Sequence, residues 1–116
     1  MTKVSTNKPL KHYSWGEGCE GWNFVDEPSL SVKQERMPAG TSEALHYHEY
    51  AQQFFFILKG TATFEIDHET VIVNEQEGIQ IKAGQKHRIT NHTAAAIEFI
   101  LSSQPSTAGD RINLSI

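Results

Sequence analysis

Several features that would assign the chain to a class of protein are scarce or missing. Its 116 residues include one cysteine, Cys19, so the chain forms no internal disulfide, and an inert thiol is favoured over a redox role. The longest apolar run, residues 54–58, is far too short to cross a bilayer, and residues 1–15 lack the apolar segment of a signal peptide. These absences predict a soluble, cytoplasmic protein with no membrane partner.

A concentration of charge of one sign is also lacking. The chain carries 10 Lys and Arg against 14 Asp and Glu, a formal net charge of -4, which argues against a nucleic-acid partner. At this length we expect one domain over residues 1–116. Residues 1–20 would form an arm and first strand, residues 30–102 the barrel core, and residues 103–116 a tail. The Ser-, Thr-, Pro- and Lys-rich segments 1–8 and 102–110 are expected to be mobile unless a partner holds them.

What the sequence does contain is a series of short strand patterns separated by turn residues, without sustained helical periodicity. Apolar residues alternate in several of them, as in Ala62, Phe64 and Ile66. We expect strands over residues 22–25, 30–37, 43–48, 52–59, 61–67, 70–74, 78–82, 87–91 and 96–102. Many short alternating strands at near-regular spacing predict an all-β sandwich or barrel.

Three histidines and a glutamine have the spacing of a metal site. His46 and His48 are two residues apart in an expected strand, so their side chains share a face, while Gln53 begins the next strand and His87 follows a turn-like segment. A single histidine in a strand is more often a hydrogen-bonded core or surface residue than a ligand. Three together at inward-facing positions favour the metal interpretation. The remaining histidines fit no such spacing and are predicted at the surface: His12, His68 and His92.

The pattern Gly40-x5-His46-x-His48-x4-Gln53-x6-Gly60 resembles the first conserved motif of the cupin family. Gln53 stands where most members of that family have a glutamate. The resemblance implies a double-stranded β-helix, or jelly-roll barrel, with a metal ion inside it. It also implies that His46, His48, Gln53 and, from a second motif, His87 are the ligands.

The second motif is similar in its ending, Gly84-x2-His87-x3-Asn91. Two positions differ from the family pattern, since Gln76 replaces the usual glycine and Lys82 the usual proline. Both differences affect the turn more than the ligands.

The ligand types limit the candidate ions to several transition metals but do not select one of them. Three imidazoles and an amide suit Zn, Fe, Ni, Cu or Mn, with one or two positions left for water or substrate, and do not suit Ca or Mg. Because Gln53 is neutral, a divalent ion would keep its full charge, and anionic ligands should bind more readily. Alternatively, Gln53 hydrogen-bonds His46 or His48 without touching the metal.

Other side chains are candidates for the cavity or for the surface. Arg36 would offer a bidentate clamp for a carboxylate or phosphate if it faces inward, although the unclean alternation of its strand favours an outward, solvated position. Phe99 is a candidate substrate-contacting or core residue. An outward apolar stripe, Phe54, Phe56 and Leu58, predicts a homodimer, because such a stripe on the outside of a barrel needs cover.

Two functions stay open. The first is a metal-dependent enzyme of dioxygenase, lyase or isomerase type that acts on a small oxygenated anion or sugar-like molecule. No clear general base accompanies it, although three candidates are near the motifs in sequence: Glu43, Glu49 and His92. The second is a non-catalytic module that binds a sugar or sugar phosphate. A metal with a purely structural role ranks last, because a structural ion favours a saturated shell.

The second function draws on a further resemblance. Tyr13-Ser14-Trp15-Gly16 and Gly109-Asp110-Arg111-Ile112 are similar to elements that flank the cupin domain of mannose phosphate isomerase and guanylyltransferase proteins. Both matches are short.

Overall fold

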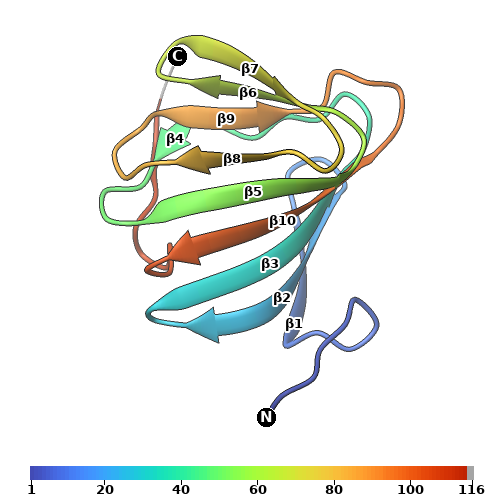
Figure 1. Cartoon of the computed structure of the whole chain (residues 1–116), viewed down its shortest axis with the longest axis vertical. Coiled ribbons are helices and arrows are strands. Elements are labelled where there is room, and N and C mark those ends of the chain that lie inside the picture. Colours follow the sequence, from blue (N-terminus) through green and yellow to red (C-terminus); the bar gives the residue numbers. More distant parts are fainter. Residues whose placement is uncertain (115–116) are drawn as a thin grey trace.

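Two β-sheets face each other in the computed structural model, which describes residues 1–114 (Figure 1). The six-stranded sheet has the order β1-β2-β3-β10-β5-β8, the five-stranded sheet has the order β11-β4-β9-β6-β7, and all pairs are antiparallel. The strands are β1 (Lys11–Trp15), β2 (Cys19–Glu27), β3 (Leu30–Met37), β4 (His46–Tyr47), β5 (Gln52–Lys59), β6 (Ala62–Ile66), β7 (Glu69–Val73), β8 (Gly78–Ile81), β9 (His87–Thr90), β10 (Ile97–Gln104) and β11 (Ile112–Asn113). This architecture is a jelly roll and confirms the all-β prediction.

Helices are absent from residues 1–114. Accordingly, this part of the chain includes no helix with the length and hydropathy needed to cross a membrane.

The core lies between the sheets and is built by alternation along each strand. On β10, Ile97, Phe99 and Leu101 are buried while their neighbours are only partly buried, and Phe64 on β6 follows the same rule. Phe55 joins the two sheets, because its ring centre is 5.0 Å from that of Phe64 and 5.5 Å from that of Phe99. Burying each of these side chains contributes on the order of 2 kcal/mol.

The interior changes character along the strands that line it. Met37 on β3, Ile57 on β5 and Ile97 on β10 are fully buried and apolar at one end. Toward the other end the inward side chains of the same strands are polar: Lys33 and Glu35 on β3, Gln53 on β5, and Ser103 on β10. The second end therefore holds a polar cavity.

The C-terminal segment, in which residues 102–110 were expected to be mobile unless a partner holds them, makes specific contacts up to Leu114. Ser103 and Gln104 belong to β10 rather than to a tail. Beyond them, the Ser106 N–H donates to the Pro28 carbonyl at 3.0 Å, and the Leu114 N–H donates to the Leu45 carbonyl at 2.9 Å. Between these points the chain runs from the end of β10 along the edge of the two sheets to β4 (Figure 1).

Candidate metal centre

Three buried histidines meet at the polar end of the interior. His46 on β4 pairs directly with His87 at the start of β9. His48 lies two residues after His46, so its side chain points to the same face. Their exposed fractions are 2%, 1% and 4% for His46, His87 and His48. One ring nitrogen from each lies within 4.8 Å of the other two, a spacing that one ion can bridge.

Each imidazole is held by a backbone carbonyl at its Nδ1 atom. For His46 and His87 the acceptor is the carbonyl two residues earlier in the chain, at 2.8 Å in both cases. For His48 it is the distant Asp110 carbonyl, at 2.5 Å. Because a carbonyl can only accept, Nδ1 carries the proton in all three rings, and each Nε2 keeps a lone pair. Metal-binding histidines in proteins are held by the same type of hydrogen bond.

Gln53 completes the cluster from β5. Its Oε1 lies 3.1 Å from His87 Nε2, while its Nε2 donates to the Ser103 hydroxyl at 3.1 Å. In this orientation two hydrogen-bond acceptors, Gln53 Oε1 and His87 Nε2, face each other, and a cation between them would remove their repulsion. Rotating the Gln53 amide by 180° would remove it without a metal, so stronger support for a metal comes from the Nε2 atom of His48. His48 Nε2 is buried and has no hydrogen-bond partner within residues 1–114, although an isolated buried acceptor is costly.

Burial keeps these imidazoles uncharged. Loss of hydration lowers the pKa of His46 to about 3 and that of His87 to about 4, and it also lowers the pKa of His48. The nearby Arg111 guanidinium acts in the same direction on all three. At neutral pH the cluster therefore offers three neutral nitrogens and an amide oxygen, a donor set that fits a divalent transition metal.

A cavity of about 280 Å³ adjoins the cluster, and β1 and β3 line much of it. Lys33 and Glu35 enter it from the same face of β3. Tyr13 on β1 crosses over β2 to donate its hydroxyl to Glu35 at 2.5 Å. A glycine is required beneath it, because a Cβ atom on Gly21 would lie 2.0 Å from the Tyr13 ring. The Lys33 ammonium lies 5.5 Å from the centre of that ring, within the range of a cation–π contact.

A carboxyl group in this cavity holds a proton at neutral pH. Although Glu43 as a whole residue is partly exposed, its carboxyl group lies in the interior, and burial raises its pKa to about 8. Its Oε1 accepts the Ile89 N–H at 3.1 Å. Burial also raises the pKa of Glu35, despite its hydrogen bond from Tyr13. The cavity thus places a proton donor near the imidazoles.

The structure does not bring Arg36 and Phe99 to this cavity. Arg36 lies on the opposite face of β3 from Lys33 and Glu35, between Glu20 and Glu98 on the neighbouring strands. Phe99 is fully buried in the apolar core. The cations that line the cavity are instead Lys33 and Arg111. Tyr13 and Arg111 belong to the two tetrapeptides singled out in the sequence, but no pattern there points to Lys33 or Glu35.

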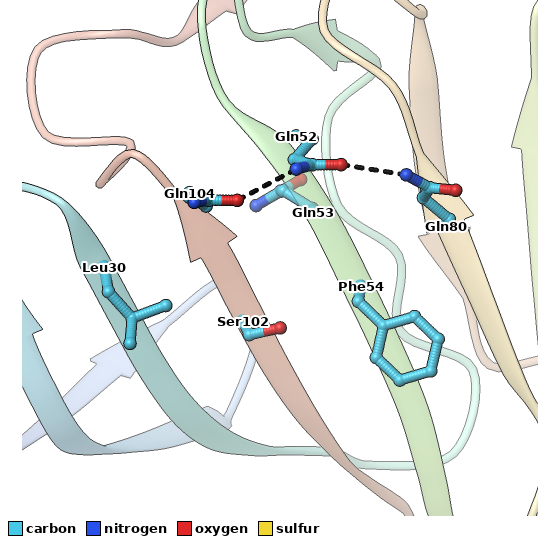
Figure 2. Close-up of a pocket in the computed structure, with 7 residues that line it drawn as sticks. All are labelled: Leu30, Gln52, Gln53, Phe54, Gln80, Ser102 and Gln104. Atoms are coloured by element: carbon cyan, nitrogen blue, oxygen red, sulfur yellow. Dashed lines mark hydrogen bonds between the residues drawn. The ribbon is translucent and has the colours of Figure 1, made fainter.

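A second hollow, about 510 Å³, lies on the outer face of the six-stranded sheet (Figure 2). Three glutamines form a ladder across it, since Gln52 donates to Gln104 at 3.0 Å and accepts from Gln80 at 2.8 Å. The remaining lining is Leu30, Gln53, Phe54 and Ser102, so no titratable side chain of residues 1–114 lines it. This hollow therefore offers no group for acid–base chemistry.

Comparison with known proteins agrees with the geometry. Residues 33–103 match a family model described as a cupin domain. Mannose-1-phosphate guanylyltransferase of Salmonella montevideo is 26% identical over 106 residues, which are 86% of this chain but 22% of that protein. The chain therefore spans about a fifth of this curated relative.

Solved structures share the fold at low sequence identity. A histidine-to-glutamine variant of Streptomyces PAC13, solved with uridine, superposes with a TM-score of 0.83 and 13% identity, covering 100% of this chain and 92% of that one. A predicted oxalate decarboxylase from Thermotoga maritima superposes with a TM-score of 0.79 and 20% identity, covering 90% and 100%. Since the family model covers more than half of the sequence and these structures share its fold, the chain belongs to the cupin family.

Proposed function

We propose that this cupin is a metal-dependent enzyme that acts on a small oxygenated anion. His46, His48, His87 and Gln53 would hold a divalent transition metal, and the substrate would occupy the adjoining cavity. The observation that supports this most is the convergence of three neutral imidazoles, with Nε2 of His48 buried and unpartnered within residues 1–114. A bound metal would supply Lewis-acid polarisation of a substrate oxygen.

The charges around the cavity favour an anion. Lys33 and Arg111 have no ion-pair partner among residues 1–114. Of the carboxyl groups beside them, Glu43 is protonated at neutral pH, and burial raises the pKa of Glu35 as well. The four proposed ligands are neutral, so they offset none of the charge of a divalent ion. A carboxylate or phosphate on the substrate would bind Lys33 and Arg111 through charge-assisted hydrogen bonds.

Glu43 favours proton-transfer chemistry among the open reaction types. A protonated carboxyl group in a cavity can donate to a leaving or enolic oxygen, and the resulting carboxylate can take the proton back. Such a step is part of lyase and isomerase reactions, whereas dioxygen insertion does not require it. A structural neighbour of this chain, Pac13, is described as a nucleoside dehydratase, which is compatible with this choice but is a property of that protein.

The test combines metal binding with turnover. Wild-type protein should bind close to one equivalent of Zn(II), Mn(II) or Co(II), and the His48→Ala variant should bind far less. Loaded protein is then offered dicarboxylates, 2-hydroxy acids and sugar phosphates, with product detection by NMR and with oxygen uptake recorded. We expect product without oxygen uptake, and loss of product in Glu43→Gln. Unchanged metal content in His48→Ala would refute the proposed site.

A second candidate is a non-catalytic module that binds a sugar phosphate. The similarity to the guanylyltransferase, which extends over 86% of this chain, favours it. For such a module, sugar phosphates would bind without product, and Glu43→Gln would leave that binding unchanged.

We also propose that the chain forms a homodimer through the outer face of β5. Phe54 is 44% exposed and Leu58 37% exposed, and the Phe54 and Phe56 rings stack with centres 6.4 Å apart. The glutamine ladder beside Phe54 offers polar groups for the edge of such an interface (Figure 2).

A further inference from the structure

The C-terminal segment passes beside the candidate metal centre. Thr107 and Arg111 line the cavity, and β11 pairs with β4, the strand that carries His46. The segment therefore forms part of the cavity wall.

Asp110 attaches this segment to the loop between β4 and β5. Its Oδ1 accepts the Glu49 N–H at 2.7 Å, and its Oδ2 accepts the N–H groups of Tyr50 and Ala51, both at 3.0 Å. Three consecutive backbone amides that converge on one carboxylate form an anion-binding nest. These hydrogen bonds join segments that are distant in sequence, because about sixty residues separate Asp110 from the three amides.

The same residue holds His48. The backbone carbonyl of Asp110 accepts the Nδ1–H of His48 at 2.5 Å. His46 and His87 differ in this respect, since each uses a carbonyl of its own segment, two residues away. Among the three imidazoles of the cluster, His48 alone depends on a contact that is distant in sequence, and it is also the one with a buried, unpartnered Nε2 in residues 1–114.

We infer that Asp110 is a positioning residue for the metal centre: its carboxylate pins the C-terminal segment so that its carbonyl fixes the ring of His48 with Nε2 toward the cluster. This inference rests on the proposed metal function. The two parts of Asp110 have separate roles, because the carboxylate makes the anchor and the carbonyl makes the contact with the imidazole. Removing the side chain leaves the carbonyl in the chain but releases it from its position.

Three variants separate positioning from general stability. Asp110→Ala removes the anchor, and Asp110→Asn keeps one oxygen acceptor, so it should have an intermediate effect and remains usable if the alanine variant does not fold. Asp26→Ala makes the same change of charge at an exposed position without a side-chain hydrogen bond in the described part of the chain. It is the matched control.

The first measurement uses the metal-free protein. Long-range ¹H–¹⁵N NMR spectra report the tautomer of each histidine. We expect His48 to lose its single Nδ1–H tautomer in Asp110→Ala while His46 and His87 keep theirs, and to keep it in Asp26→Ala. An unchanged His48 tautomer, or an equal change in all three histidines, would overturn the inference.

The second measurement is the affinity for Co(II), followed by its visible absorption. Residues that orient a metal ligand typically change affinity by about 10- to 100-fold, so the Kd of Asp110→Ala should rise by that factor and its spectrum should change. A wild-type Kd and spectrum in that variant would overturn the inference. If wild-type protein bound no Co(II), the proposed metal function would fail, and the His48 tautomer would still decide the role of Asp110.

Discussion

The two ends of the interior are built on the same strands and do different things. On β3, Met37 is fully buried at one end, while Lys33 and Glu35 line the cavity at the other. On β5 the corresponding residues are Ile57 and Gln53. Apolar burial stabilises the fold, whereas buried polar and titratable groups reduce its stability unless they are paired. The apolar end therefore supports a cavity end that is arranged for binding, and substitutions at the two ends should have different consequences.

The largest effect on stability is expected at the apolar end. Phe64 is fully buried and its ring packs against Phe55, so Phe64→Ala should lower the free energy of unfolding by about 3–5 kcal/mol. Urea denaturation measures this loss. Tyr50→Ala, which removes an aromatic side chain that is 70% exposed and lies outside the proposed dimer interface, should cost much less. Equal losses would contradict the assignment of the core.

At the cavity end, the loss should be in metal affinity rather than in stability. His48→Ala should weaken the binding of Zn(II) or Co(II) by more than about 100-fold, on the order of 2.7 kcal/mol. The metal-free variant should lose less stability than Phe64→Ala, because the substitution removes the hydrogen bond to the Asp110 carbonyl but also a buried Nε2 that lacks a partner within residues 1–114. Isothermal titration and thermal melts test both halves. His92→Ala, at an exposed histidine, is the control and should bind metal like wild type.

Glu43 makes the comparison dependent on pH. Its folded-state pKa, about 8, lies above that of the unfolded chain, so between these values the folded protein holds a proton that the unfolded chain releases. Its contribution to stability is present below pH 4 to 5 and is lost as the pH rises toward 8, by about 1.4 kcal/mol per pH unit at most. Glu43→Gln should therefore gain stability over wild type as the pH rises from 5 to 8. Parallel pH profiles of the two proteins in urea denaturation would contradict a buried, protonated Glu43.

The buried histidines should make the free energy of unfolding rise with pH, the opposite of the effect of Glu43, and should do so at lower pH. Because the pKa values of His46 and His87, about 3 and about 4, lie below the ordinary value, the unfolded chain binds more protons than the folded protein in that window. Stability of the metal-free protein should rise as the pH increases from about 4 to 6.5. The double variant His46→Ala/His87→Ala should have a flatter profile over this range. An equally steep profile would mean that these imidazoles are accessible to protons in the folded state.

The outer face of β5 should be the least important for stability and the most important for association. Phe54→Glu should change the stability of a single chain by less than about 1 kcal/mol, since Phe54 is an exposed side chain. It should nevertheless convert a dimer into a monomer by burying a charge in the proposed interface. Light scattering at matched concentrations measures the mass of both proteins. Lys59→Glu is a control at the end of the same strand, and a dimer in all three proteins would exclude this interface.

The strands that the sequence predicted best are those with clear alternation and clear ends. Residues 30–37 and 52–59 coincide with β3 and β5, because Pro38 and Gly60 mark where they end. A first strand is expected within residues 1–20, but the bounds of β1 are not predicted, since it lies at the edge of its sheet and its residues are mainly polar. The two-residue β11 is defined by its pairing with β4, which no local pattern can reveal.

The histidine cluster could be anticipated from spacing, but the charged side chains of β3 beside it could not. His46, His48 and His87 are brought together by the pairing of β4 with β9. Lys33 and Glu35 were overlooked because charged residues that alternate on a strand usually face solvent, and here they face a cavity. Arg36, one residue away, is the side chain that the sequence offers as an inward candidate, and a shift of one residue in a strand reverses the face. Asp110 carries no sign in the sequence of its contact with His48.

The hydrogen bond between His48 and Asp110 has a consequence for the order of events during biosynthesis. A ribosome releases the chain from its amino end, so the three imidazoles emerge before the carbonyl that orients one of them, which follows 62 residues after His48. An ion that arrives during translation meets ligands of which one is still free to rotate. Tight uptake of the proposed ion would thus be a late event, coupled to the docking of Asp110 and β11 beside β4.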